Sequence, residues 1–305
     1  MKSLKKWGLF LIVFLFTSLA FSETYVAEND LQRVIDAAKD GDIIILNNSF
    51  NEKVEVIGKE LKFISMGESG EISFIDDKNT ENIFNEKPVI YLESATVTLE
   101  NIKISASNVV GIGILNSSVY LKNVTIELNN GIGLVSVSDE KNESYMKLEM
   151  VKILDKKYRK VSGKNVSLTF SSVGILGSYN TTIIANNIDI SGMKKAFVLE
   201  NKESYIFNSN FSENEISLMI LSGNQNIINN KFKLNVQAIV AANNSSVSLI
   251  NNYFDENNQD LELLSKDCSS CPKTKKFTGV LKGYSNVSKS LLIKNNFSNH
   301  FWDNE

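Results

Sequence analysis

One short pattern returns three times at almost constant spacing in the stretch from Ser204 to Asn257. The pattern is Ile-x-Asn-x-x-Phe-x-x-Asn, and it starts at Ile206, at Ile227 and, with leucine in first place, at Leu249. The period is therefore 21 to 22 residues. A unit of this size is one supersecondary turn that cannot bury its own apolar face, so it must stack on its neighbours. The repeat predicts a solenoid.

A related pattern, Val-x-Leu-x-Asn-x-x-Ile, extends the repeat toward the N-terminus. It starts at Val97, returns 22 residues later at Val119, and has a weaker copy at Met146. Three strands per period that all run the same way make one rung of a parallel β-helix, and the span from Asp42 to Trp302 has room for about eleven or twelve rungs. The third strand of each rung is a separate apolar run, as at Gly111–Leu115, Gly131–Val135, Gly174–Leu176, Ala196–Leu199, Leu218–Leu221 and Ala238–Ala241.

The segment from Asn29 to Gly41 predicts one amphipathic helix before the first rung. Asn29 or Asp30 is suited to cap this helix, and Gly41 is suited to end it. The run Ile43–Leu46 that follows is typical of a buried parallel strand, so the helix is expected to cover the open first coil. The apolar helix positions are Leu31, Val34, Ile35 and Ala38, and further short strands are expected at Lys53–Ile57, Leu61–Ser65, Glu71–Ile75 and Val89–Glu93.

The repeated asparagines have a structural explanation. Between the second and third strands the chain must bend within one or two residues, which requires a left-handed conformation that asparagine tolerates well. Stacked amides can also hydrogen-bond along the rod as a ladder. We therefore interpret five of them as bend residues rather than ligand contacts: Asn101, Asn123, Asn208, Asn229 and Asn251.

The opening Leu31–Leu46 and the asparagine repeats resemble the right-handed parallel β-helix superfamily, which comprises the pectate-lyase-like proteins and their repeat-containing relatives. The resemblance implies an all-β fold, a right-handed single-stranded parallel β-helix with an N-terminal capping α-helix, in one domain over residues 23–305. It implies no single function, because that superfamily includes lyases, hydrolases, esterases, epimerases, adhesins and accessory proteins.

The N-terminal segment predicts export. A lysine-rich start is followed by the apolar run Trp7–Phe21 and by small residues up to Ser22, which is typical of a signal peptide over residues 1–22. The alternative is an uncleaved anchor, but the run is shorter than the roughly 20 residues that a bilayer requires. Without the segment the net charge is about −6, which gives no reason to expect a nucleic-acid partner. We expect a secreted or periplasmic protein with no membrane span after cleavage.

Cysteine and histidine are scarce. The two cysteines, Cys268 and Cys271, form a Cys-Ser-Ser-Cys sequence, and in an oxidising compartment they predict a local disulfide. A zinc site would need two further soft ligands, and the single histidine, His300, stands where other repeats have asparagine. No metal and no cofactor is expected.

Three stretches interrupt the period and are the places where a ligand site is expected. They are Ser138–Ser144, Asp155–Ser172 and Lys266–Lys276. Basic side chains alternate with aromatic ones in the last two, a mixture suited to an anionic sugar polymer; the alternative is that these are solvated loops. The candidate ligand-binding residues are Lys156, Lys157, Tyr158, Arg159, Lys273, Lys275, Lys276 and Phe277.

The sequence departs from the enzymes of the superfamily. Lyases of this fold resemble one another in using acidic clusters for calcium and an arginine or lysine as base, whereas here the only arginines are Arg33 and Arg159. General acid and base catalysis of glycosidic cleavage requires two carboxylates roughly 5 to 9 Å apart. The predicted strands carry no aligned column of acidic residues, and we assign no catalytic residue.

The sequence therefore favours a β-helix repeat protein that acts as a binding or structural surface module, with polysaccharide or a cell-surface glycan as the expected partner. Two alternatives remain. One is a polysaccharide lyase or glycoside hydrolase with a site beside the 155–172 insertion, and the other is a periplasmic accessory protein, which the scarcity of His, Cys and Met disfavours. An enzyme predicts a cleft with paired ionisable groups, and a binding rod predicts a flat face with exposed aromatic side chains.

Overall fold

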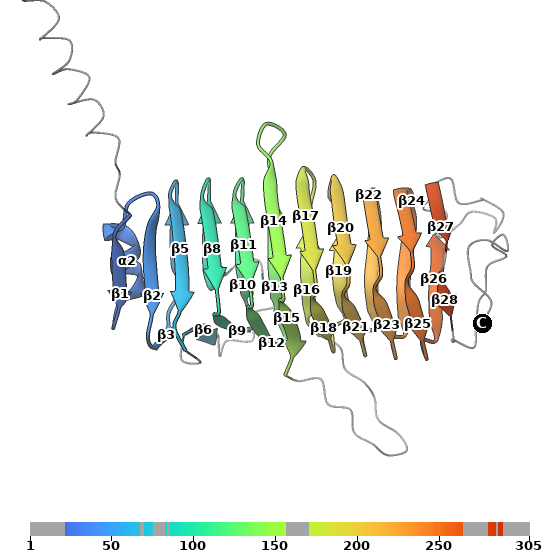
Figure 1. Ribbon diagram of the computed structural model, residues 1–305, viewed down its shortest axis with the longest axis horizontal. Coiled ribbons are helices and arrows are strands. Elements are labelled where there is room, and N and C mark those ends of the chain that lie inside the picture. Colours follow the sequence, from blue (N-terminus) through green and yellow to red (C-terminus); the bar gives the residue numbers. More distant parts are fainter. Residues whose placement is uncertain are drawn as a thin grey trace, which may run out of the picture.

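The computed structural model describes residues 22–67, 70–75, 83, 86–156, 171–264, 280–284 and 286–288. In these residues short strands stack in the order of the sequence along one elongated body, with a single helix at its N-terminal end (Figure 1). Every strand pairing is parallel, and strands of one turn pair with those of the next. This arrangement is consistent with the expected parallel β-helix-like fold.

Each turn contributes one strand to each of three faces, which we call faces 1, 2 and 3. Faces 1 and 2 join into one 18-stranded sheet, and face 3 is a separate 10-stranded sheet. Nine complete turns, β4–β6 through β26–β28, can be followed in the described residues. Face 1 holds β4 (Val54–Ile57), β7 (Ile90–Glu93), β10 (Val110–Leu115), β13 (Ile132–Val137), β16 (Val173–Gly177), β19 (Lys195–Leu199), the first halves of β22 (Ile216–Ile228) and β24 (Gln237–Ile250), and β26 (Gln259–Leu264).

The other two faces follow the same order. Face 2 holds β1 (Thr24–Ala27), β2 (Asp42–Leu46), β5 (Glu60–Ser65), β8 (Thr96–Glu100), β11 (Ser118–Lys122), β14 (Ser144–Glu149), β17 (Thr181–Asn186), β20 (Glu203–Phe207), the second halves of β22 and β24, and β27 (Val280–Tyr284). Face 3 holds β3 (Ser49–Asn51), β6 (Glu71–Ile75), β9 (Lys103–Ser107), β12 (Thr125–Asn129), β15 (Lys152–Asp155), β18 (Asp189–Ser191), β21 (Asn210–Ser212), β23 (Lys231–Lys233), β25 (Tyr253–Asp255) and β28 (Val287–Ser288).

Residues that lie one repeat apart in the sequence pair with each other on neighbouring strands of the stack. Val97 pairs with Val119 and Val119 with Met146, as the repeat predicts. Two turns differ from the expected separate strands, because β22 and β24 each run from face 1 into face 2 as one strand, with an irregularity in their pairing between Ile220 and Ser222.

Apolar side chains of the repeat fill the interior. Phe211, Phe232 and Phe254 are fully buried in consecutive turns. Their rings stack with centroids 5.1 and 5.0 Å apart and nearly parallel planes. Offset stacking of this kind adds to the burial of three large side chains, so the phenylalanine of the repeat is a core residue.

The asparagine of the repeat occupies the corner between faces 2 and 3. Asn101, Asn123, Asn208, Asn229 and Asn251 all have φ between 51° and 58°, which is the left-handed region. Their amides also pair along the rod, as from Asn123 Nδ2 to Asn101 Oδ1 at 2.8 Å. The prediction that they serve as bend residues is confirmed.

A second set of asparagines, which the sequence did not distinguish, points inward. Asn230 and Asn252 directly follow two of the bend residues and are almost fully buried. Asn252 Nδ2 donates to Ile227 O at 2.8 Å and to Asn286 Oδ1 at 3.1 Å. These amides satisfy buried backbone groups at the corner, which would otherwise lack partners.

Helix α2 (Leu31–Ala37) is shorter than the expected Asn29–Gly41. Asp30 caps its N-terminus by accepting a hydrogen bond from Arg33 N at 2.8 Å. It ends at Ala37 because Asp42, buried at the start of β2, accepts hydrogen bonds from Lys39 N and from Glu23 N and thereby draws the chain into a turn. The helix lies against β1 and β4 at the end of the stack.

Candidate functional site

Most of the side chains predicted to bind ligand lie outside the described residues. These are Lys157, Tyr158, Arg159, Lys273, Lys275, Lys276 and Phe277, together with the predicted disulfide cysteines Cys268 and Cys271, His300 and residues 1–21 of the predicted signal peptide. Lys156 alone is described. Its ammonium group pairs with Glu127, whose carboxylate also lies 3.0 Å from Lys103 Nζ.

Glu127 belongs to an ion-pair network on face 3. Lys103 Nζ also lies 3.5 Å from Glu71 Oε2, so two carboxylates flank one lysine. Burial raises the pKa of Glu127, yet hydrogen bonds from Lys156 and Lys103 outweigh it and hold the pKa below its usual value. A groove of 320 Å³ lies beside the network, lined by Gly67, Gly70, Asn101, Ile102, Lys103, Asn123, Thr125 and Glu127. Because each acid already faces a cation, Lys156 is a member of a structural ion-pair network.

The long connections all border one face of the fold. The four longest connections between described strands are 76–89, 138–143, 156–172 and 265–279, and all four adjoin face 1. Two lead from face 3 into face 1, and two lead from face 1 into face 2. The first of them was not recognised as an insertion in the sequence. Face 1 is therefore the strand surface that the long connections border, which makes it a candidate site.

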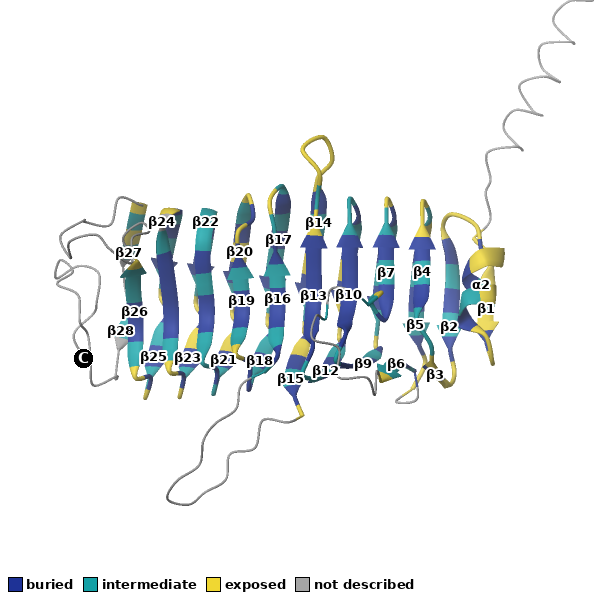
Figure 2. Cartoon of the chain, turned by 180° about the vertical axis from the view of Figure 1, so that it is seen from behind, coloured by how far each residue is buried: buried dark blue, intermediate teal, exposed yellow. Residues whose placement is uncertain are grey.

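An apolar row crosses the middle of the outward side of face 1, between Glu55 at one end and Glu262 at the other. Val135, Leu176, Val198 and Met219 pair in register on consecutive strands of this face, alternating with the inward residues that fill the core. Figure 2 looks onto this side of the molecule. Strands that are apolar on both sides are typical of sheets covered on both sides, so an outer face of this composition indicates contact with another apolar surface.

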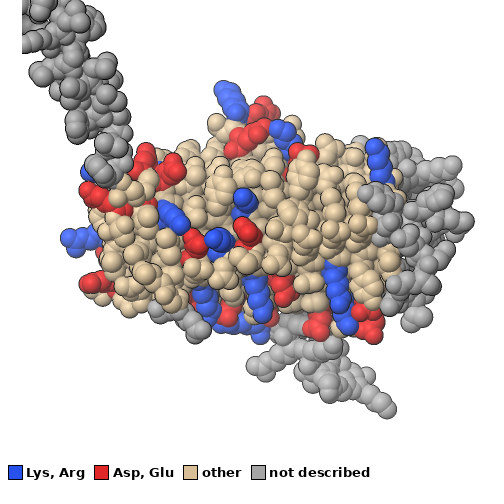
Figure 3. Space-filling model, in the orientation of Figure 1, with Lys and Arg blue, Asp and Glu red and all other residues tan. Residues whose placement is uncertain are grey.

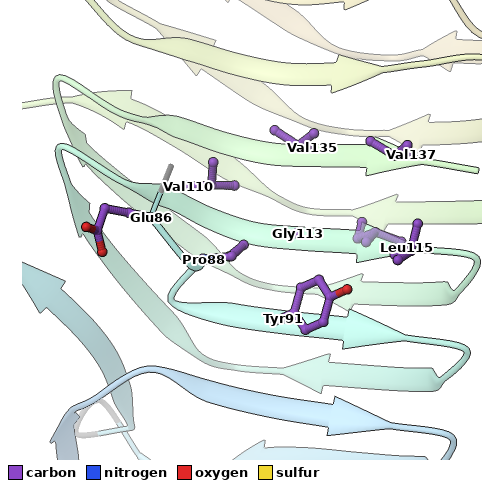
Figure 4. Close-up of a pocket in the computed structure, with 9 residues that line it drawn as sticks. Glu86, Pro88, Tyr91, Val110, Gly113, Leu115, Val135 and Val137 are labelled. Carbon is purple, nitrogen blue, oxygen red and sulfur yellow. The ribbon is translucent and has the colours of Figure 1, made fainter. Parts of the chain in front are cut away.

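A pocket of 260 Å³ opens on face 1 (Figure 4). It exists because Gly113 interrupts the outward row between Tyr91 and Val135, which pair with it on either side. Pro88 packs over the glycine, and a Cβ at position 113 would lie 2.5 Å from Pro88 Cγ. The lining residues are Glu86, Pro88, Tyr91, Val110, Gly113, Ile114, Leu115, Val135 and Val137.

Face 2 has a different outer surface, which carries tyrosines (Figure 3 shows this side). Tyr120 and Tyr145 lie on neighbouring strands with ring centroids 5.7 Å apart. Tyr205 lies further along the same face, and Ile184 pairs with it in register. Lys147 pairs in register with Tyr120 and is exposed. We call Tyr120, Tyr145 and Tyr205 the tyrosine row.

The hydroxyl groups of the tyrosine row are held differently. Tyr205 Oη donates to Glu203 Oε1 at 2.7 Å, and this hydrogen bond raises the pKa of Tyr205. Burial, with the adjacent Tyr120, raises the pKa of Tyr145. Tyr145 and Tyr205 therefore remain neutral at physiological pH. The sequence predicted aromatic contacts in the insertions and did not distinguish the three strand tyrosines, because they come from different turns.

Comparison with known proteins assigns no function to this arrangement. No protein-family model matches the chain, and no curated protein matches it. In the described part of the chain no three His, Cys, Asp or Glu side chains are grouped closely enough to hold a metal ion. No described helix is both long and apolar enough to cross a membrane.

Proposed function

We propose that the protein is an exported binding module whose tyrosine row on face 2 holds a polysaccharide. The fold we propose is a right-handed parallel β-helix of the pectate-lyase-like superfamily, of about eleven or twelve rungs, capped by α2. Removal of residues 1–22 places it in the periplasm or outside the cell.

The observation that carries the proposal is the alignment of the tyrosine row on one strand face. Tyr120 is 36% exposed and Tyr205 39% exposed, so each has a ring surface open to a ligand. Neighbouring strands of face 2 are displaced by about 4.8 Å, and the row presents aromatic surface to an extended chain on three of the four consecutive strands β11, β14, β17 and β20. Aromatic rings stack on the apolar faces of sugars, and polar side chains beside them supply hydrogen bonds.

The experiment measures retention and product release with a panel of anionic and neutral polysaccharides. Retention without products supports the proposal, and product release contradicts it. We expect Tyr120→Ala and Tyr205→Ala each to weaken binding by about tenfold, which corresponds to about 1.4 kcal/mol per ring.

Tyr179→Ala is the matched control. Tyr179 is 70% exposed and lies in the turn before β17, outside the tyrosine row. Its removal should leave retention unchanged. Equal losses in all three variants would point to a general effect of tyrosine removal and would overturn the assignment of the row.

A lyase or hydrolase beside the 155–172 insertion is the second candidate. The observation that favours it is Asp155, a buried carboxylate at the base of that insertion, which accepts a hydrogen bond from Ser171 Oγ at 3.3 Å. The same panel distinguishes it, because an enzyme releases products and loses this activity in Asp155→Asn.

A further inference from the structure

We propose that the pocket on face 1 is a docking site for a protein partner, and that it receives one aliphatic or aromatic side chain from a basic segment of that partner. This site is separate from the tyrosine row, which lies on face 2. The proposal rests on the shape of the pocket, on its lining and on the charges at its edge.

The size of the pocket favours a single side chain. Its 260 Å³ falls just below the roughly 300 to 1,000 Å³ of small-molecule sites, and it matches the kind of pocket that receives one anchor residue at a protein interface. The wall consists of Pro88, Tyr91, Leu115, Val135 and Val137, as Figure 4 shows. Burial, followed by the hydrogen bond to Glu93, raises the pKa of Tyr91, so its ring stays neutral.

The pocket has an existing rigid frame. Val135 belongs with Val110 and Ile132 to a small apolar cluster on the outside of the sheet, against which Val173 and Leu176 also pack. These side chains stand on strands that pair in register. Because the pocket is formed by a sheet and a proline, binding requires little ordering of the protein, which favours affinity.

The edge of the pocket toward face 2 is acidic. Glu93 pairs in register with Leu115, and its described contact is the hydroxyl group of Tyr91 at 3.2 Å. Asp139 lies at the same corner, because Asn116, the residue after Leu115, donates to Asp139 Oδ2 at 3.1 Å. Glu140 follows in the same exposed loop.

These charges identify the partner. Three acids beside an apolar pocket complement a segment that places Lys or Arg close to its apolar anchor. Of the lysines nearby, Lys53 pairs with Glu86 and Lys87 with Glu55, and Lys141 in the exposed loop is one cation beside three acids. Interfaces commonly combine a buried apolar anchor with a charged rim.

The test is a selection of random 12-residue peptides on the purified full-length protein, followed by affinity measurement of the enriched peptides. We expect these peptides to carry an aliphatic or aromatic residue within three positions of Lys or Arg. Their binding should weaken at least tenfold with Val137→Lys, because the lysine adds bulk and positive charge at the pocket. It should weaken about threefold with Glu93→Gln and Glu140→Gln combined.

Leu264→Lys is the matched control for Val137→Lys. Both are apolar residues at the ends of face 1 strands, and Leu264 is 37% exposed and Val137 46% exposed. Leu264 is on β26, away from the pocket. Binding that survives Val137→Lys, or that falls equally with Leu264→Lys, overturns the proposal. Enrichment of acidic peptides also overturns the proposal, and so does a selection in which no peptide is enriched.

The methyl resonances of Leu115 and Val135 give a second measurement on the unmutated protein. An enriched peptide should shift them in a saturable manner while leaving those of Leu221, further along the face, unchanged. Absence of such a shift overturns the proposal even if Val137→Lys fails to fold. Because the tyrosine row is not involved, its variants should bind the peptides normally.

Discussion

The side-chain amide of Asn230 donates to Oδ1 of Asn252 over 3.2 Å, and both residues lie in the buried interior of consecutive turns. Asn252 Oδ1 also accepts from Asn230 N at 3.0 Å. One side chain thus satisfies polar groups of the turns on both sides, which ties the turns together where no water reaches.

We expect Asn252→Ala to lower the free energy of unfolding by about 2 to 4 kcal/mol, since several buried polar groups lose their partner. The measurement is the midpoint of urea unfolding, because stacked turns need not unfold in one step. Asn251→Gly is the control. Its exposed position has φ of 52°, which glycine adopts readily, so its midpoint should stay close to that of the unmutated protein.

The phenylalanine stack predicts a loss of stability that grows with the size of the cavity that a substitution leaves. Phe232→Ala should destabilise the protein by about 3 to 5 kcal/mol, and Phe232→Leu by less, because leucine leaves a smaller cavity between Phe211 and Phe254. Phe207, on the outside of β20, is only half-buried, and Phe207→Ala should cost clearly less than Phe232→Ala. Equal melting temperatures for the two alanine variants would contradict the assignment of Phe232 as a central core residue.

One corner holds a methionine in the left-handed conformation, which is unfavourable for that residue. Met150 occupies the corner between faces 2 and 3 with φ of 54°, where neighbouring turns have asparagine. Met150→Asn should therefore raise stability by about 0.5 to 1 kcal/mol. Met150→Ala keeps the Cβ in the left-handed region and should give no such gain. A melting temperature for Met150→Asn at or below that of Met150→Ala would contradict this explanation.

A row of charges on face 2 predicts a dependence on pH. Lys62 and Lys122 lie 2.9 and 3.2 Å from the carboxylate oxygens of Glu100. Their hydrogen bonds, that of Lys62 first, hold the pKa of Glu100 below its usual value. Since the pKa is lower in the folded state, the stabilisation is present above the unfolded value of about 4.3 and is lost as pH falls through the folded value.

Glu100→Gln should accordingly lower stability at pH 7 by less than about 1 kcal/mol, because the pair is partly exposed. At pH 3 the melting temperatures of the two proteins should converge, and 1 M salt should narrow the difference at pH 7. A difference that persists unchanged in acid would show that the carboxylate acts through packing instead.

The register of the stack was predictable from the sequence because the period is local and repeated. Phe211, Phe232 and Phe254 recur at spacings of 21 and 22 residues, and they pair in register on consecutive strands. The two roles of adjacent asparagines were not predictable. In Asn229-Asn230 the first bends the chain outward and the second turns inward, and this difference comes from the left-handed residue itself, which interrupts the alternation of sides along a strand.

The candidate sites were less predictable than the fold. The sequence showed the positions of three insertions. It did not show at which corner of the rod each one lies, because that depends on how each turn folds into three strands. The pocket needs Pro88 to lie over Gly113, a contact between a connection and a strand in the next turn. Tyr120, Tyr145 and Tyr205 become neighbours on one surface only after stacking.

The long connections lie where the chain can tolerate changes in length. The corners at 76–89, 138–143, 156–172 and 265–279 lie at the borders of one face, while the strands on either side keep their parallel register. Residues can therefore be added or removed at these corners without altering the pitch of the stack, because loop length changes closure entropy only slowly. The rod is suited to display foreign peptides there, in two lines along the opposite borders of one face.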